Sequence, residues 1–216
     1  GERTLAFGHR DRRANPELGY NPLLERRMRT VLPLCNAVGT RIVTNMGVAN
    51  PLAAAQRTAE IAAELGLKGL KIAAVTCDEV NRLVSPDTPL LEPACKLSET
   101  GRQMLAANAY LGIDAILPAI EAGADVIITG RVADPSLFLA PLAHHFEWDL
   151  QDWQTIGAGT AVGHLLECSA QVTGGYFADP GLKVVPSLAN VGFPLAEVDA
   201  NGDAVITKLS DSGGLV

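Results

Sequence analysis

Three short apolar runs alternate with helical segments, and this alternation constrains the fold more than any other feature. The runs are RIVTNMG at 41–47, GLKIAAVTCDEV at 69–80 and DVIITG at 125–130. Continuous apolar character is typical of strands that are covered on both faces. Strand and helix in alternation predict an α/β fold with a mainly parallel sheet, flanking helices and Rossmann-like layering.

Helix boundary signals surround these runs. Asn21-Pro22 and Asn50-Pro51 are typical N-cap and N1 pairs, and glycines follow the helical segments that they open. We therefore predict helices over 21–39 and 50–66, then two helices over 98–123 that Gly112 separates. A further helix is predicted to begin at Asp134.

The last third of the chain has a different character. A Gly- and Ala-rich segment that begins at residue 151 predicts a helix with a Gly-Gly stop at 174–175. Asn201-Gly202, between two apolar runs, predicts a C-terminal β-hairpin.

The organisation predicted is a single α/β domain, or a fragment of a larger one, over 1–216, with a more variable portion from about 150 to 216. The chain begins in a charged helical pattern with no preceding strand and ends in a glycine loop, as a fragment would. The Pro-rich text at 81–96 predicts an excursion loop.

Composition narrows the classes of partner. A formal net charge of -7 and scattered basic residues argue against nucleic acid and anionic membranes. The basic clusters at 9–13 and 26–29 are interpreted as solvated helix faces. Four cysteines without CxxC spacing, no bilayer-length apolar run and no signal-peptide pattern predict a soluble cytoplasmic protein with reduced thiols.

Polar residues follow each predicted strand, and ligands of parallel α/β sheets bind at the carboxyl ends of the strands. The three loops offer amides, a thiol, carboxylates and one guanidinium, carried by Thr44, Asn45, Gly47, Asn50, Thr76, Cys77, Asp78, Glu79, Thr129, Gly130, Arg131 and Asp134. Asp134 either caps a helix or belongs to a site. Arg131 either binds an anionic ligand or pairs with Asp134, and Cys77 is favoured as a buried inert thiol over a nucleophile.

The segment GAGTAVGHLLECSAQ at 157–171 supports several interpretations. His164, Cys168 and Gln171 fall on one helical face, so that His164 could do acid-base chemistry or bind a metal with Cys168. Plain packing is the favoured alternative, because GxxxG spacing brings backbones close and HxxxC alone is weak evidence for zinc. Neither a strand-GxGxxG-helix unit nor GxxxxGK[ST] occurs, so we predict no cofactor and no metal.

In combination, several stretches resemble the acyclic terpene utilisation (AtuA) family. They are GYNPLLERRM, RIVTNMGVANPLAAA, ANAYLG, GADVIITGRVADPSLFLAPL, GAGTAVGHLLECSAQVTGGYF, GFPLAEV and VITKLSDSGGLV. The resemblance implies a bacterial, cytoplasmic role in terpenoid catabolism through CoA thioesters, without a known reaction. TNMGVANP departs from the family's usual SNAGG-NP pattern, because Met46 and Val48 replace smaller residues.

The predicted function is a catabolic enzyme, or a fragment of one, that acts on a small branched acid or its CoA thioester. We expect Asn45, Asn50, Arg131 and Thr160 to bind substrate, with Asp134 or His164 moving a proton, in a homo-oligomer. The alternatives are a non-catalytic scaffold or partner subunit of an acyl-CoA-processing complex, and a ligand-binding regulator.

Overall fold

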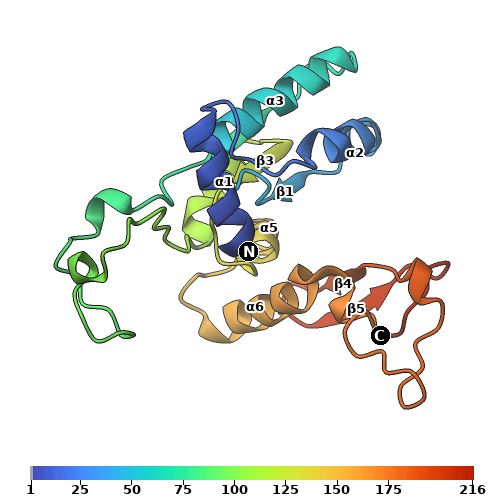
Figure 1. Cartoon of the computed structure of the whole chain (residues 1–216). Coiled ribbons are helices and arrows are strands. Elements are labelled where there is room, and N and C mark those ends of the chain that lie inside the picture. Colours follow the sequence, from blue (N-terminus) through green and yellow to red (C-terminus); the bar gives the residue numbers. More distant parts are fainter. Residues whose placement is uncertain (1) are drawn as a thin grey trace. The chain divides into compact units, whose positions relative to one another are not determined.

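A computed structural model describes residues 2–216, and the chain divides into two compact units, 1–132 and 133–216. The first unit contains all three predicted strands, and the second contains the Gly- and Ala-rich helix and the hairpin (Figure 1).

The first unit is built on a three-stranded parallel sheet. Its strands are β1 (Ile42–Thr44), β2 (Ile72–Val75) and β3 (Val126–Thr129), in the order β1-β3-β2. Both pairings are parallel, and Val126 lies opposite Ile42 on one side and Ile72 on the other. All four residues of β3 are buried, because the sequence VIIT presents apolar or small side chains to both faces. The predicted parallel sheet is confirmed.

Helices flank this sheet within the first unit. They are α1 (Glu2–Ala14), α2 (Leu24–Val38), α3 (Pro51–Glu64) and α4 (Leu117–Glu121), with short 3-10 turns η1 (Asn81–Leu83), η2 (Leu97–Thr100) and η3 (Ile113–Ala115). Helices α2 and α3 pack side by side (Figure 1). Their apolar stripes meet β3 in one core, which contains Leu24, Met28, Leu32, Met46, Ala54, Ile61, Ala62, Val126 and Ile128.

The helix ends follow their predicted caps with one shift. The Asn50 side chain accepts a hydrogen bond from Ala53 N at 3.3 Å, Pro51 is the first helical residue, and Gly39 ends α2 with a φ of 72°. Asn21 does not cap α2 directly, because the helix begins later, at Leu24. Its side chain instead accepts from Leu23 N at 2.9 Å and shapes the turn that leads into the helix.

The prediction of a helix over 98–112 is wrong. Only the short turn η2 forms there, and the following residues pair with the loop after β2. Val80 N donates to Ala107 O at 2.8 Å, and Ala109 N donates to Asp78 O at 2.7 Å. These pairings satisfy backbone groups that a helix would have satisfied internally, so tertiary context overrides the local pattern. The second predicted helix is reduced to η3 and α4.

The second unit contains α5 (Ser136–His145), α6 (Trp153–Glu167), the turns η4 (Ser169–Gln171) and η5 (Leu188–Asn190), and the strands β4 (Pro194–Val198) and β5 (Ala204–Lys208). The two strands pair antiparallel, which confirms the predicted hairpin. Gly159 gives close packing as expected, because a Cβ there would lie 2.6 Å from Leu139 and 2.7 Å from Trp148.

Two boundaries in this unit differ from prediction. Pro135, rather than Asp134, occupies the N-cap of α5, and Ser136 is its first helical residue. Helix α6 ends at Glu167 rather than at the Gly-Gly pair, because Ser169 adopts a left-handed φ of 55° that a helix cannot continue through. The α/β class is therefore observed. Rossmann-like layering stays a prediction, because a sheet of three strands does not by itself establish it.

Candidate functional site

A small cavity lies at the carboxyl ends of β1 and β3, where the sequence predicted a ligand. Its volume is about 80 Å³, and it is lined by Thr4, Leu5, Asn21, Asn45, Val48, Gly130 and Arg131. We call it the oxygen cavity, because the amide, hydroxyl and guanidinium groups that line it can donate hydrogen bonds to an oxygen atom. The apolar Leu5 and Val48 also line it. Asn45 follows β1 directly and Arg131 follows β3 by one residue, so the parallel sheet brings these two predicted residues together.

Arg131 is held in place from several directions. Its side chain is buried, its Nε donates to the Val132 carbonyl at 2.8 Å, and its guanidinium carbon lies 4.7 Å from the centre of the Tyr110 ring. Stacking on an aromatic face suits the planar guanidinium and restricts its rotamers. Tyr110 in turn donates from its hydroxyl to Glu2, which lowers the pKa of that carboxyl.

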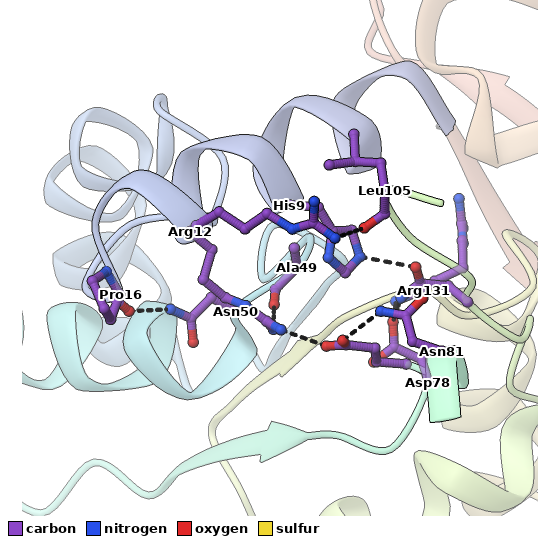
Figure 2. Close-up of polar contacts among 12 residues, drawn as sticks. His9, Arg12, Pro16, Ala49, Asn50, Asp78, Asn81, Leu105 and Arg131 are labelled. Carbon is purple, nitrogen blue, oxygen red and sulfur yellow. Dashed lines mark hydrogen bonds and ion pairs between the residues drawn. The ribbon is translucent and has the colours of Figure 1, made fainter. Parts of the chain in front are cut away.

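Asn45 and Asn50 have different roles in the structure. No hydrogen bond to the Asn45 side chain is formed within residues 2–216, so its amide is open to a ligand in the oxygen cavity. The Asn50 amide instead donates to Pro16 O at 2.8 Å and to Leu18 O at 2.7 Å, and its oxygen caps α3. Asn50 does not line the cavity. Its amide instead holds the loop that contains Pro16 and Leu18, and Figure 2 shows the contact with Pro16.

Three residues for which the sequence predicted no substrate-binding or catalytic role form a hydrogen-bonded chain that reaches the backbone of Arg131. Figure 2 labels His9, Asp78 and Arg131 of this region. Asp78 accepts from Arg131 N at 2.8 Å and from Asn108 Nδ2 at 2.9 Å. Asn108 Oδ1 lies 2.9 Å from His9 Nε2. We call this the Asp78–Asn108–His9 chain. It connects α1, the loop after β2 and the backbone of Arg131.

The packing around this chain is tight. A Cβ on Gly130 would lie 2.5 Å from Asp78 Oδ1, so only glycine leaves room for the carboxylate there. Cys77, which precedes Asp78, has a φ of 78°, and this left-handed conformation is unusual for a residue with a side chain. Cys77 itself is exposed, so its predicted burial is wrong.

Arg12 fixes α1 to the same loops. Its guanidinium donates to Ala49 O and to Glu79 Oε2, the latter at 2.5 Å. Burial by itself would raise the pKa of Glu79, but the hydrogen bond from Arg12 and its positive charge outweigh burial and lower it. Helix α1 is therefore anchored to the loops after β1 and β2.

His9 corrects one prediction about the basic cluster at 9–13. The cluster was expected to be a solvated helix face, but His9 is only 3% exposed and Arg12 is partly buried by its partners. A sequence signal was present, because Leu5 and His9 are four residues apart and face the same side of a helix. Asp78 was expected among the polar residues at the carboxyl ends of the strands, and Asn108 lies in the stretch ANAYLG, but neither was predicted to bind substrate or to transfer a proton.

Asp134, Thr160 and His164 belong to the second unit. His164 lines a pocket of about 390 Å³ with Leu165, Glu167, Cys168, Gln171, Val172, Tyr176 and Phe177. The single helical face predicted for His164, Cys168 and Gln171 is not formed, because α6 ends at Glu167, but the three residues line the same pocket. Thr160 is exposed, its hydroxyl donates to Ile156 O at 2.7 Å, and it does not line this pocket.

Cys168 is a poor nucleophile in this pocket. Its thiol donates to Glu167 Oε1 at 2.8 Å, and this hydrogen bond, followed by burial and by the charges of Glu167 and Asp134, raises its pKa. A raised pKa reduces the thiolate fraction, so the pocket favours neutral Cys168. Within residues 2–216, no group of three or more His, Cys, Asp or Glu side chains is arranged to hold a metal.

Comparisons with known proteins agree with the resemblance seen in the sequence. The family model described as acyclic terpene utilisation family protein AtuA matches residues 1–216, the whole chain. The chain therefore belongs to the acyclic terpene utilisation family. Neither the curated proteins nor the solved structures gave a match. Across the described residues, no helix is long and apolar enough to cross a bilayer.

Proposed function

Starting from membership of the acyclic terpene utilisation family, we propose that the chain is a catabolic enzyme that acts on a small branched acid or its CoA thioester. The carboxylate or thioester oxygen of the substrate binds in the oxygen cavity. Asn45 and Arg131 are the principal donors to that oxygen.

The observation that carries this proposal is that Asn45 and Arg131, 86 positions apart (131 − 45), line the same cavity. A volume of about 80 Å³ suits a carboxyl or thioester head group rather than a whole substrate. Leu5 and Val48 give the cavity an apolar side that suits the branched carbon next to the head group.

The donors are suited to negative charge on oxygen. A guanidinium and an amide aimed at one oxygen stabilise a carboxylate in the ground state and an enolate or tetrahedral oxyanion during reaction. Because Arg131 is already held by the Val132 carbonyl and the Tyr110 ring, it loses little conformational freedom when a ligand binds.

The second unit supplies a separate set of proposed residues. We keep Asp134 and His164 as candidates for proton transfer and Thr160 as a candidate for substrate binding. The support for His164 is its position in an otherwise largely apolar pocket beside Glu167. Turnover by His164→Gln and Asp134→Asn variants tests these assignments separately from binding in the oxygen cavity.

Calorimetric titration with isovalerate and citronellate tests the binding proposal. Asn45→Ala and Arg131→Lys each remove hydrogen bonds to a charged group, so we expect a loss of affinity of about 10- to 100-fold. Arg26→Lys, at an exposed position of α2, is the matched control and leaves affinity unchanged. Affinities of both cavity variants equal to that of the unmodified chain would overturn the proposal.

A further inference from the structure

A second cavity of the first unit lies at the carboxyl end of β2. Its volume is about 510 Å³, and it is lined by Arg12 of α1 and by residues of the loop after β2, among them Cys77, Glu79, Arg82 and Leu83. We call it the arginine pocket, because both Arg12 and Arg82 line it. It shares no lining residue with the oxygen cavity, so it is a separate place for a ligand.

The charged groups that line the arginine pocket favour an anion. Two guanidiniums outnumber the single carboxylate, Glu79, although the chain as a whole has a formal net charge of -7. Arg12 is fixed by hydrogen bonds to Ala49 O and to Glu79 Oε2 (Figure 2). The Arg82 side chain is exposed and forms no hydrogen bond or ion pair with any other residue of 2–216. Its guanidinium is therefore available to a ligand, and its planar fork suits two hydrogen bonds to a phosphate.

The remaining surface of the arginine pocket is partly apolar. Val80 and Leu83 line it, and Leu83 is 82% exposed, so a ligand can cover apolar area there. The volume lies within the range of roughly 300–1,000 Å³ that is typical of small-molecule sites. A molecule that carries phosphate groups beside a flat organic ring fits both kinds of surface, and nucleotides have this chemistry.

The arginine pocket and the oxygen cavity lie at the same edge of the sheet. Strands β1, β3 and β2 are parallel neighbours in this order, and adjacent strands are about 4.8 Å apart. Asp78, in the loop that lines the arginine pocket, accepts at 2.8 Å from N of Arg131, which lines the oxygen cavity. Arg12 donates to Ala49 O, and Ala49 is next to Val48 of the oxygen cavity. The two sites are therefore close enough for one ligand with a flexible arm to span them.

We infer that the arginine pocket binds the phosphate groups of coenzyme A, so that the substrate is the CoA thioester rather than the free acid. The inference rests on the proposed function, because it takes the acyl group to lie in the oxygen cavity. The long pantetheine arm of CoA connects the two sites along the edge of the sheet. Arg82 is the principal partner of the phosphates, and Arg12 adds positive charge from a fixed position.

Calorimetric titration of the 216-residue chain tests the charge of the pocket. The ligands are desulfo-CoA, which carries all the phosphates of CoA but no thiol, and pantetheine, which carries no phosphate. We expect Arg82→Gln to weaken desulfo-CoA binding about 10-fold, because it removes a charge-assisted pair at an exposed position, and to leave pantetheine binding unchanged. Arg82→Lys keeps the charge and should lose less. Arg26→Gln, at an exposed position of α2, is the matched control.

Two results of this titration would overturn the inference. One is equal affinity of the unmodified chain and of Arg82→Gln for desulfo-CoA. The other is inorganic phosphate that binds as tightly as desulfo-CoA, which would mean a general anion site without recognition of CoA. Because Arg82 is exposed and has no partner in residues 2–216, its substitution is expected to leave the fold intact.

Alkylation of Cys77 locates the ligand independently. Cys77 lines the arginine pocket and is exposed, so bound desulfo-CoA should slow its reaction with iodoacetamide in proportion to the occupied fraction, as followed by mass spectrometry of its peptide. Cys168, which is exposed in the second unit, is the internal control. In Arg82→Gln the same desulfo-CoA concentration should protect Cys77 less. An unchanged rate for Cys77 at saturating desulfo-CoA would contradict the location.

The outcomes distinguish this inference from the proposed function. Arg82 does not line the oxygen cavity, so Arg82→Gln should bind isovalerate as the unmodified chain does. If isovalerate binds and desulfo-CoA binding does not depend on Arg82, the inference fails and the proposed function stands. If isovalerate does not bind while desulfo-CoA binding depends on Arg82, the proposed function fails and the phosphate site stands.

Discussion

Gly130 is the position where one added methyl group most directly perturbs the candidate site. A Cβ there would lie 2.5 Å from Asp78 Oδ1, 2.7 Å from Oδ2 and 2.8 Å from Cγ. Ordinary contacts are near 3.5 Å, so the carboxylate has to move by about 1 Å. Asp78 is only 5% exposed and accepts from Arg131 N and Asn108 Nδ2, so it cannot move without weakening those hydrogen bonds.

The expected cost follows from those contacts. Overpacking a buried site costs about 1–3 kcal/mol, and a weakened hydrogen bond to a charged group adds about 1.5 kcal/mol or more. The lower entropy of the unfolded alanine chain returns about 0.5 kcal/mol. We therefore expect Gly130→Ala to lower the free energy of unfolding of the first unit by about 2–4 kcal/mol, with weaker isovalerate binding because the backbone of Arg131 loses its anchor.

The assay has to report on the first unit. Both tryptophans, Trp148 and Trp153, lie in the second unit, so urea unfolding is followed by hydrogen exchange of peptides that contain β3. Gly157→Ala is the control, because a Cβ there meets nothing within 4 Å and the position is inside α6. Asp78→Ala removes the obstructed carboxylate, so most of the Gly130→Ala effect should disappear in that background. Unchanged protection of β3 in Gly130→Ala would refute the reasoning.

Three further substitutions test other parts of the account. Asn50→Ala should destabilise α3 by about 1–3 kcal/mol, because it removes a helix cap and two donors to backbone carbonyls; unchanged urea unfolding would contradict this. Arg57 is the main cause of the lowered pKa values of Glu25 and Glu60, and it adds to the larger effect of Arg29 on the lowered pKa of Glu64. Its stabilisation is therefore present above the unfolded pKa of these glutamates and is lost as pH falls through their folded pKa values. Arg57→Gln should thus destabilise the chain at neutral pH more than in acid, with a difference that shrinks in high salt; equal effects at both pH values would count against the network. Glu167→Gln should lower the pKa of Cys168 and speed its alkylation in mild alkali, with Cys77 in the same sample as the internal control; an unchanged ratio of the two rates would contradict the assignment.

The sheet and the first helices could be predicted because their signals are local. Apolar runs of four to six residues, Asn-Pro caps and terminating glycines act within one element, and they located the strands and α3 correctly. The segment 98–112 could not be predicted in this way. Its backbone pairs with the loop after β2, and no pattern inside the segment encodes that partner.

The same difference between local signals and distant partners applies to the residues of the candidate site. Asn45 and Arg131 were predictable because both follow parallel strands, and the carboxyl ends of such strands converge. The contact of His9 was missed because its hydrogen-bond partner, Asn108, is 99 positions away and in an irregular segment. Asn50 was assigned to substrate, whereas its amide is used by Pro16 and Leu18, contacts that only the folded loop reveals.

The central claim is that Asn45 and Arg131 hold one oxygen of an acyl ligand. A crystal structure of the chain soaked with citronellate tests it most directly. We expect a carboxylate oxygen within hydrogen-bonding distance of both the Asn45 amide and the Arg131 guanidinium, with the carbon chain against Leu5 and Val48. A carboxylate bound away from both donors, in crystals of the unmodified chain, would contradict it.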